Sequence, residues 1–139
     1  MDRILIDTMW IEAIFSKEEP PYTTLAEAID NGKIIGVSSV VSITEMIKNL
    51  GKKDEERMEI TIRELKSSEI ILVNVTQKIA ERAGQLRLRY DIPTIDSLIA
   101  ATGIVENIGK ILTEDTRHFG PIKNHLKITT IQQALKAAR

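Results

Sequence analysis

Short apolar runs rich in β-branched residues recur along the chain and predict buried β-strands. They do not alternate strictly between apolar and polar positions, which is typical of strands covered on both faces. The runs lie at residues 4–7, 34–37, 69–75 and 110–113, with a weaker run at 126–129. The pattern therefore predicts a central sheet of about five strands, buried between two layers.

Between these runs, apolar residues recur three or four positions apart, which is the spacing of one face of an α-helix. Two such faces consist of Trp10, Ile11, Ile14 and Phe15, and of Val40, Ile43, Ile47 and Leu50. Further helices are predicted at residues 24–31, 54–66, 76–89, from Pro93 onward, and 130–138. Ser39 and Thr94 are predicted N-caps, and Gly32 a helix stop. Strands that alternate with helices predict an α/β fold with a mostly parallel sheet. We expect residues 1–139 to form a single domain.

Acidic residues stand where several of these elements begin or end. Asp7 closes the first predicted strand, and Asp115 lies two residues after the fourth. Because ligands of open parallel sheets bind outside the carboxyl ends of the strands, both carboxylates would share one edge if these strands are neighbours. A simpler interpretation also holds for each: Asp7 caps the following helix, and Asp115 begins a turn.

Two further acids lie within predicted helices. Glu45 stands just beside an apolar stripe, where a solvated helix position is the simpler interpretation. Asp96 lies in the first turn of a helix that is otherwise small and apolar on most sides. A helix N-terminus stabilises a nearby anion by about 0.3–1 kcal/mol, which explains an acid at this position. It does not explain why so little polar surface surrounds Asp96.

Taken together, Asp7, Glu45, Asp96 and Asp115 predict a cation site. Clustered carboxylates repel one another, so that one or more would bind a proton unless a cation joined them. Mg²⁺ and Mn²⁺ prefer oxygen ligands of this kind. Ions held in this way activate water for attack on a phosphodiester. The sequence thus indicates metal-dependent phosphodiester chemistry.

The composition of the chain excludes several classes of functional site. The chain has 139 residues, a net charge of −1, two histidines and no cysteine. Disulfides, thiol catalysis and thiolate metal sites are therefore excluded, and a zinc site is not expected. The start MDRILID has no signal-peptide pattern and no apolar run is long enough to span a membrane, which predicts a soluble, cytoplasmic protein without a membrane partner. The net charge gives no global positive field, but a local basic groove remains open.

Four segments of the sequence resemble the PIN domain, from residue 4 to about residue 131. They are ILIDT, SITE, DSLIAATGI and LTEDTRHF. Within that family the chain looks most like the single-domain VapC-type ribonuclease toxins of prokaryotic toxin–antitoxin pairs. The resemblance implies a three-layer α/β/α fold with the strand order 3-2-1-4-5.

The resemblance also implies a function and a partner. It predicts a Mg²⁺- or Mn²⁺-dependent endoribonuclease that acts on RNA, binds an antitoxin protein and forms a homodimer. The matching positions are the metal-binding and catalytic acids Asp7, Glu45, Asp96 and Asp115, with Thr8 and Thr113 orienting carboxylates or water. Arg117, which closely follows Asp115, is the predicted contact to substrate phosphates, although a plain surface charge explains it equally well.

The sequence departs from the family pattern at several positions. Met9 and Trp10 stand where small or polar residues are common, and His118 stands where a further acid is common. Glu114 is a candidate substitute for that acid, and the number of metal ions stays open. We interpret His118 as a turn or packing residue. Trp10, with its neighbours Ile14 and Phe15, forms either core or the rim of a groove for an antitoxin.

Two other functions compete with a nuclease. In the first, the chain is a non-catalytic PIN-like scaffold or regulatory module that binds metal without cleaving RNA. In the second, it is a phosphatase or phospho-receiver domain, but that pattern requires a second acid two residues after Asp7, where Met9 stands. The sequence contains neither a G-x-x-x-x-G-K-[ST] nor a G-x-G-x-x-G loop, so nucleotide-binding functions are not indicated.

Overall fold

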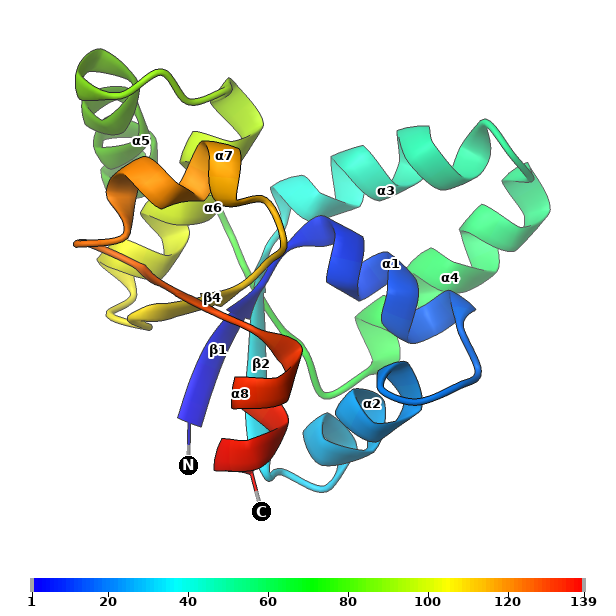
Figure 1. The fold of residues 1–139 in the computed structure, drawn as a ribbon. Coiled ribbons are helices and arrows are strands. Elements are labelled where there is room, and N and C mark those ends of the chain that lie inside the picture. The colour runs from blue at the N-terminus through cyan, green and yellow to red at the C-terminus, as the bar shows by residue number, and fades with distance from the viewer. Residues whose placement is uncertain (1, 139) are drawn as a thin grey trace.

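The structure, a computed structural model, describes residues 2–138 and contains a five-stranded sheet between two layers of helices (Figure 1). Its strands are β1 (Asp2–Ile6), β2 (Ile34–Ser39), β3 (Ile71–Val73), β4 (Lys110–Leu112) and β5 (Lys127–Thr129). All neighbouring strands are parallel, and their order is β3-β2-β1-β4-β5. The predicted α/β/α fold and strand order are confirmed, and β1 and β4 are neighbours.

Helices connect the strands and cover both faces of the sheet. They are α1 (Thr8–Ser16), α2 (Tyr22–Asp30), α3 (Val41–Gly51), α4 (Glu55–Ser67), α5 (Gln77–Arg89), α6 (Thr94–Val105), α7 (Thr116–Phe119), the 3₁₀ turn η1 (Gly120–Ile122) and α8 (Ile131–Ala137). None of the helices in the described part of the chain is long and apolar enough to cross a membrane.

Two hydrophobic cores lie on opposite faces of the sheet. Ile4 and Ile6 of β1 pack in one core with side chains of α1, α2, α4 and α8. Leu5, between them in sequence, packs in the other core with side chains of α5, α6 and α7. Successive side chains of a strand point to opposite faces, so a strand buried on both sides must be apolar at every position. This explains the unbroken apolar runs in the sequence.

Helix α6 packs unusually close to its neighbours, which accounts for its small and apolar sequence. It contacts β2 and β4 as well as α5. Ala100 and Ala101 are fully buried, and a Cβ atom added at Gly103 would lie 3.0 Å from the side chains of both Leu5 and Leu126. Small residues are therefore required on several faces of this helix, and the first turn of α6 brings Asp96 close to the edge of the sheet.

Several predicted boundaries are wrong by a residue. The first strand ends at Ile6, and Asp7 is the N-cap of α1 rather than the last strand residue. The N-cap of α6 is Pro93 rather than Thr94, because Thr94 is already the first helical residue. The N-cap of α3 is Val40 instead of Ser39, although the Ser39 hydroxyl accepts a hydrogen bond from the Val41 amide. The stop at Gly32 is confirmed, because Gly32 has a φ of 75° just after α2.

Two helical predictions also need correction. The buried face of α3 is centred on Ser42 and Met46, both fully buried, whereas Ile47 is 45% exposed. The reason is that α3 packs against α1 and α4 on one side and α6 on another, so a small polar residue enters the buried face. Helix α7 was not predicted, because a single turn is too short to show a hydrophobic period.

Candidate active site

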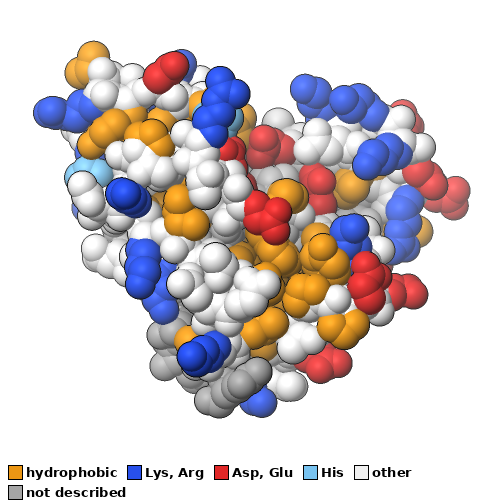
Figure 2. Space-filling model, viewed as in Figure 1, with side chains coloured by type: hydrophobic (Ala, Val, Ile, Leu, Met, Phe, Trp, Pro, Cys, Tyr) orange, Lys and Arg blue, Asp and Glu red, His pale blue; other side chains and the backbone are white. Residues whose placement is uncertain are grey.

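An open cavity of about 530 Å³ lies where β1 and β4 end and α1, α3, α6 and α7 approach one another. Figure 2 shows acidic side chains gathered in a hollow in the upper part of the molecule, with Lys and Arg side chains on both sides of it. The cavity is lined by Asp7, Thr8, Met9, Glu12, Glu45, Asn49, Asp96, Glu114, Asp115 and His118. All four acids that the sequence singled out therefore lie at one site.

Asp7 links the first helix to the cavity. Its Oδ1 accepts a hydrogen bond of 2.9 Å from the Thr8 amide, and its Oδ2 accepts one of 2.7 Å from the Thr113 hydroxyl. Asp7 is nearly buried, with 9% of its surface exposed. The two interpretations of Asp7, helix cap and cavity acid, are thus not exclusive, because one carboxylate occupies both positions.

Glu45 is held in place by hydroxyl groups rather than left in solvent. The Thr8 hydroxyl donates a 2.6 Å hydrogen bond to Glu45 Oε1 and lies 2.8 Å from the Ser42 hydroxyl. Thr8 therefore orients Glu45, while Thr113 orients Asp7. Both threonines are buried, so each fixes a carboxylate from a rigid position.

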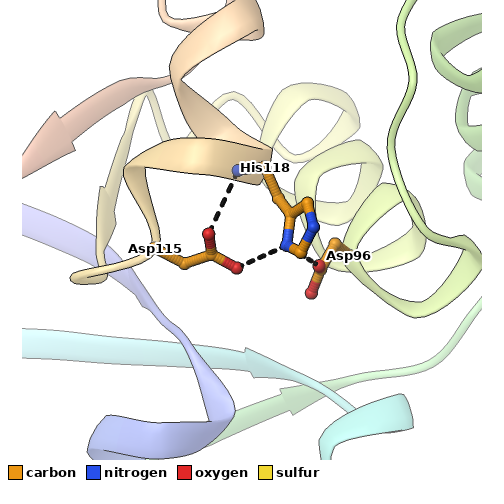
Figure 3. Close-up of side chains that lie close together, drawn as sticks. All are labelled: Asp96, Asp115 and His118. Atoms are coloured by element: carbon orange, nitrogen blue, oxygen red, sulfur yellow. Dashed lines mark hydrogen bonds and ion pairs between the residues drawn. The ribbon is translucent and has the colours of Figure 1, made fainter.

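Asp96 and Asp115 meet at the ring of His118 (Figure 3). His118 Nδ1 lies 2.7 Å from Asp115 Oδ2 and 3.0 Å from Asp96 Oδ2. The His118 amide also donates a 3.1 Å hydrogen bond to Asp115 Oδ1, because Asp115 is the N-cap of α7. His118 is thus more than a turn or packing residue. The three-residue spacing from Asp115 places both on one face of a helical turn, and this signal was present in the sequence.

Sequence reasoning missed a second pair in the cavity. Asn49 Nδ2 donates a 3.2 Å hydrogen bond to Glu12 Oε2, and both residues line the cavity. Glu12 follows Thr8 by four residues and Asn49 follows Glu45 by four, so each lies one helical turn from a residue already singled out. That spacing was a usable signal.

The two remaining candidate residues, Glu114 and Arg117, have exposed side chains. Glu114 lines the cavity and its side chain is exposed, so its role as a substitute for an acid at position 118 stays a prediction. Arg117 is exposed and is not among the described residues that line the cavity. Its position is therefore on the surface beside the site.

The crowded acids disturb one another's protonation. Burial, followed by the negative charge of Asp7, raises the pKa of Asp96 from its ordinary value of 3.8 to about 6, although His118 opposes the shift. Burial also raises the pKa of Asp7 and of Glu12, and the charge of Glu45 adds to both shifts. Carboxylates that resist ionisation in this way are stabilised when a cation enters among them.

These raised pKa values predict that the unfolding free energy of the metal-free protein depends on pH. A carboxyl group whose pKa is raised by folding binds more protons in the folded state than in the unfolded state. Stability therefore falls as pH rises between the two pKa values. For Asp96 the window runs from pH 3.8 to about 6. We expect the metal-free protein to lose about 1–3 kcal/mol of unfolding free energy across it.

The measurement is urea unfolding in EDTA at a series of pH values. Millimolar MgCl₂ or MnCl₂ should restore stability near neutral pH and have less effect near pH 4, where Asp96 holds a proton. The variant Asp96→Asn should flatten the metal-free profile. An unfolding free energy that rises with pH through this window would contradict a raised pKa of Asp96.

Comparison with known proteins identifies the family. The PIN domain sequence model matches residues 4–122, which is most of the chain. The chain belongs to the PIN domain family. The resemblance seen in the sequence is thereby confirmed. A search of curated protein sequences gives no match.

Solved structures share the fold of this PIN domain. VapBC2 from Rickettsia felis, bound to a DNA fragment of its promoter, is 20% identical with a TM-score of 0.76, covering 92% of this chain and 98% of its own. DNA-bound VapBC from Salmonella typhimurium is 19% identical with a TM-score of 0.76, covering 94% and 99%. A toxin–antitoxin complex from Klebsiella pneumoniae is 23% identical with a TM-score of 0.65, covering 92% and 97%. At these identities the likeness concerns the fold.

Proposed function

We propose that this PIN domain is a Mg²⁺- or Mn²⁺-dependent endoribonuclease and the toxin of a type II toxin–antitoxin pair. The observation that carries the proposal is the convergence of Asp7, Glu45, Asp96 and Asp115 on one open cavity. PIN domains are generally nucleases, and this convergence is the arrangement that metal-dependent hydrolysis needs.

The donor set fits a hard divalent ion. The cavity presents carboxylate oxygens from separate segments of the chain, and a thiolate ligand is excluded because the chain has no cysteine. Burial and the neighbouring carboxylates raise the pKa values of Asp7 and Asp96, and a cation in the cavity would favour the ionised form of both. A bound Mg²⁺ or Mn²⁺ would make water more acidic and stabilise negative charge on phosphate oxygens.

The surrounding residues position this chemistry. Asp7, Glu45, Asp96 and Asp115 would hold the ion, and the hydroxyls of Thr8 and Thr113 fix two of these carboxylates through the hydrogen bonds described above. Rigid placement matters because misplacing a reacting group by about 1 Å costs on the order of a hundredfold in rate. Attack by water on an RNA phosphodiester would leave a 5′-phosphate on the product.

Cations beside the cavity are suited to the RNA backbone. Lys48, Lys52 and Lys53 are exposed at the end of α3 and just after it, and Arg117 is exposed on α7. Basic residues on both sides of an acidic hollow would hold phosphates across it, while the acids remain free for the ion. Arg117 is the candidate closest in sequence to an active-site acid.

An antitoxin partner is supported by the neighbouring structures, several of which are toxin–antitoxin complexes. In this chain Ile14 and Phe15 line a groove of about 230 Å³ together with Ile29 and Ile70. Trp10, by contrast, is buried in the core, which is the first of its two predicted positions. The proposed protein acts in the cytoplasm, as a homodimer.

The proposal is tested by incubating the purified protein with end-labelled RNA. We expect cleavage in Mn²⁺ or Mg²⁺, no cleavage in EDTA, and recovery when the ion is restored. The 5′ ends of the products should accept a phosphate from ATP and kinase only after phosphatase treatment. If the protein binds the ion yet leaves diverse structured and unstructured RNAs intact, it is a non-catalytic PIN module.

A further inference from the structure

His118 occupies an unusual place among the acids of the cavity. Its Nδ1 lies between two carboxylate oxygens that come from different elements, 3.0 Å from Asp96 on α6 and 2.7 Å from Asp115 at the start of α7 (Figure 3). One atom of each of the three residues lies within 4.8 Å of the others, which is close enough for all three to bind one ion.

The spacing of these atoms matches neighbouring ligands of one metal ion. In octahedral coordination with ligands at 2.0–2.2 Å, adjacent donor atoms are about 3 Å apart. The two N···O distances are of that size. A hydrogen bond accounts less well for the two contacts of His118 Nδ1. A single ring N–H points at one acceptor, so it explains the contact with Asp96 or the contact with Asp115, but not both equally.

The fold, rather than a free choice of rotamer, brings the ring to this position. The His118 amide binds Asp115 Oδ1, which leaves Oδ2 turned toward the ring. The next residue, Phe119, is fully buried and anchors the single turn of α7. His118 itself lines the cavity and its side chain is 29% exposed, so an ion can reach it from solvent.

We propose that His118 Nδ1 is a ligand of the divalent ion and makes the site prefer Mn²⁺ to Mg²⁺. The inference rests on the proposed function in so far as an ion must enter the cavity. Mg²⁺ takes oxygen ligands and water, whereas imidazole nitrogen suits transition metals. Mn²⁺ accepts both kinds of donor. Between these two ions, a mixed set of carboxylates with one imidazole therefore favours Mn²⁺ over Mg²⁺, and we expect about tenfold tighter binding of Mn²⁺.

Electron spin echo spectroscopy of the Mn²⁺-loaded protein tests the bond directly. Nitrogen bound to Mn²⁺ gives a hyperfine modulation, and labelling histidine with ¹⁵N changes its frequency. The chain has only two histidines, and His125 is exposed beside Tyr90 and is not among the described residues that line the cavity. We expect the modulation in the wild-type protein and in His125→Ala, and its loss in His118→Ala.

Calorimetry tests the metal preference. His118→Asp replaces the nitrogen with a carboxylate oxygen, and we expect the ratio of Mn²⁺ to Mg²⁺ affinity to fall by about tenfold or more. Circular dichroism melting confirms that each variant is folded. The spectrum of the wild-type protein tests the inference even if no variant folds. If the Mn²⁺-loaded wild-type protein shows no nitrogen modulation, the inference is overturned. An unchanged affinity ratio in His118→Asp also overturns it.

The outcomes separate this inference from the nuclease proposal. RNA cleavage in Mn²⁺ without nitrogen modulation would remove His118 from the ligand set and leave the nuclease intact. Nitrogen modulation without cleavage of any RNA would support the ligand and remove the nuclease. A protein that binds no Mn²⁺ at millimolar concentration would overturn both.

Discussion

Asp7→Asn should reduce metal-dependent RNA cleavage by at least about a hundredfold while the protein remains folded. Asp7 is a nearly buried carboxylate of the cavity, and its charge raises the pKa of Asp96. Replacing it with a neutral amide removes a negative charge from the cavity, and under the proposed function that charge would help to hold the ion. Asparagine is as good an N-cap as aspartate, so α1 should still begin at residue 8. The measurement is the initial rate of cleavage of labelled RNA in Mn²⁺.

A matched control exists in the same chain. Asp54 is the N-cap of α4 and accepts a hydrogen bond from the Arg57 amide, but it is exposed and is not among the described residues that line the cavity. Asp54→Asn makes the same chemical change at another cap and should leave the cleavage rate unchanged. Equal activity in wild type and Asp7→Asn would mean that the cleavage comes from a contaminating nuclease or that the cavity acids are not catalytic.

Phe119→Ala should destabilise the protein by about 3–5 kcal/mol. Phe119 is among the largest fully buried side chains and packs in the core that α5, α6 and α7 share with the sheet. Removing its ring loses apolar burial and leaves a cavity that a close-packed core fills only in part. The expected result is a lower midpoint of urea unfolding with a similar slope.

Phe119 also lies directly after His118, in the same turn as Asp115. We therefore expect Phe119→Ala to weaken Mn²⁺ binding at temperatures where the protein is still folded. Leu88→Ala is the comparison, because Leu88 is 86% exposed and its truncation should change stability by less than about 0.5 kcal/mol. A loss below 1 kcal/mol for Phe119→Ala would show that the α7 turn is not held by its core contact.

The sequence predicted most of the fold because local patterns carry most of that information. Buried strands need apolar residues at every position, and helices that cover a sheet need an apolar stripe. Both requirements can therefore be recognised in the sequence. The Ile79, Ala83 and Leu86 stripe of α5 is buried as its spacing predicts. Some errors fall where one residue separates two states, as at Pro93 and Thr94, or where a helix is too short for a period, as in α7. Others concern the buried face of α3 and the strand predicted at residues 69–75, of which only Ile71–Val73 forms β3.

The site was predicted less completely. Asp7 and Asp115 were found because they follow predicted strands, and Glu45 and Asp96 because they lie within apolar helices. The structure brings all four acids to one cavity. Glu12 and Asn49 were missed because exposed helix positions with Glu or Asn are common and only a neighbouring helix turns them toward a site. His118 was assigned to packing because its meaning depends on Asp96, a residue from another element.

The sequence alone determined which segments form the strands and most of the helices, and which residues are able to bind a cation. These properties depend on residue type and on spacing along the chain. Only the tertiary structure decided that Thr113 supports Asp7, that Thr8 supports Glu45, and that the ring of His118 lies between two acids. The physical reason is that hydrogen bonds and charge interactions act over a few ångströms in space. The distances that govern them follow from the parallel order of the strands, which places the ends of β1 and β4 side by side.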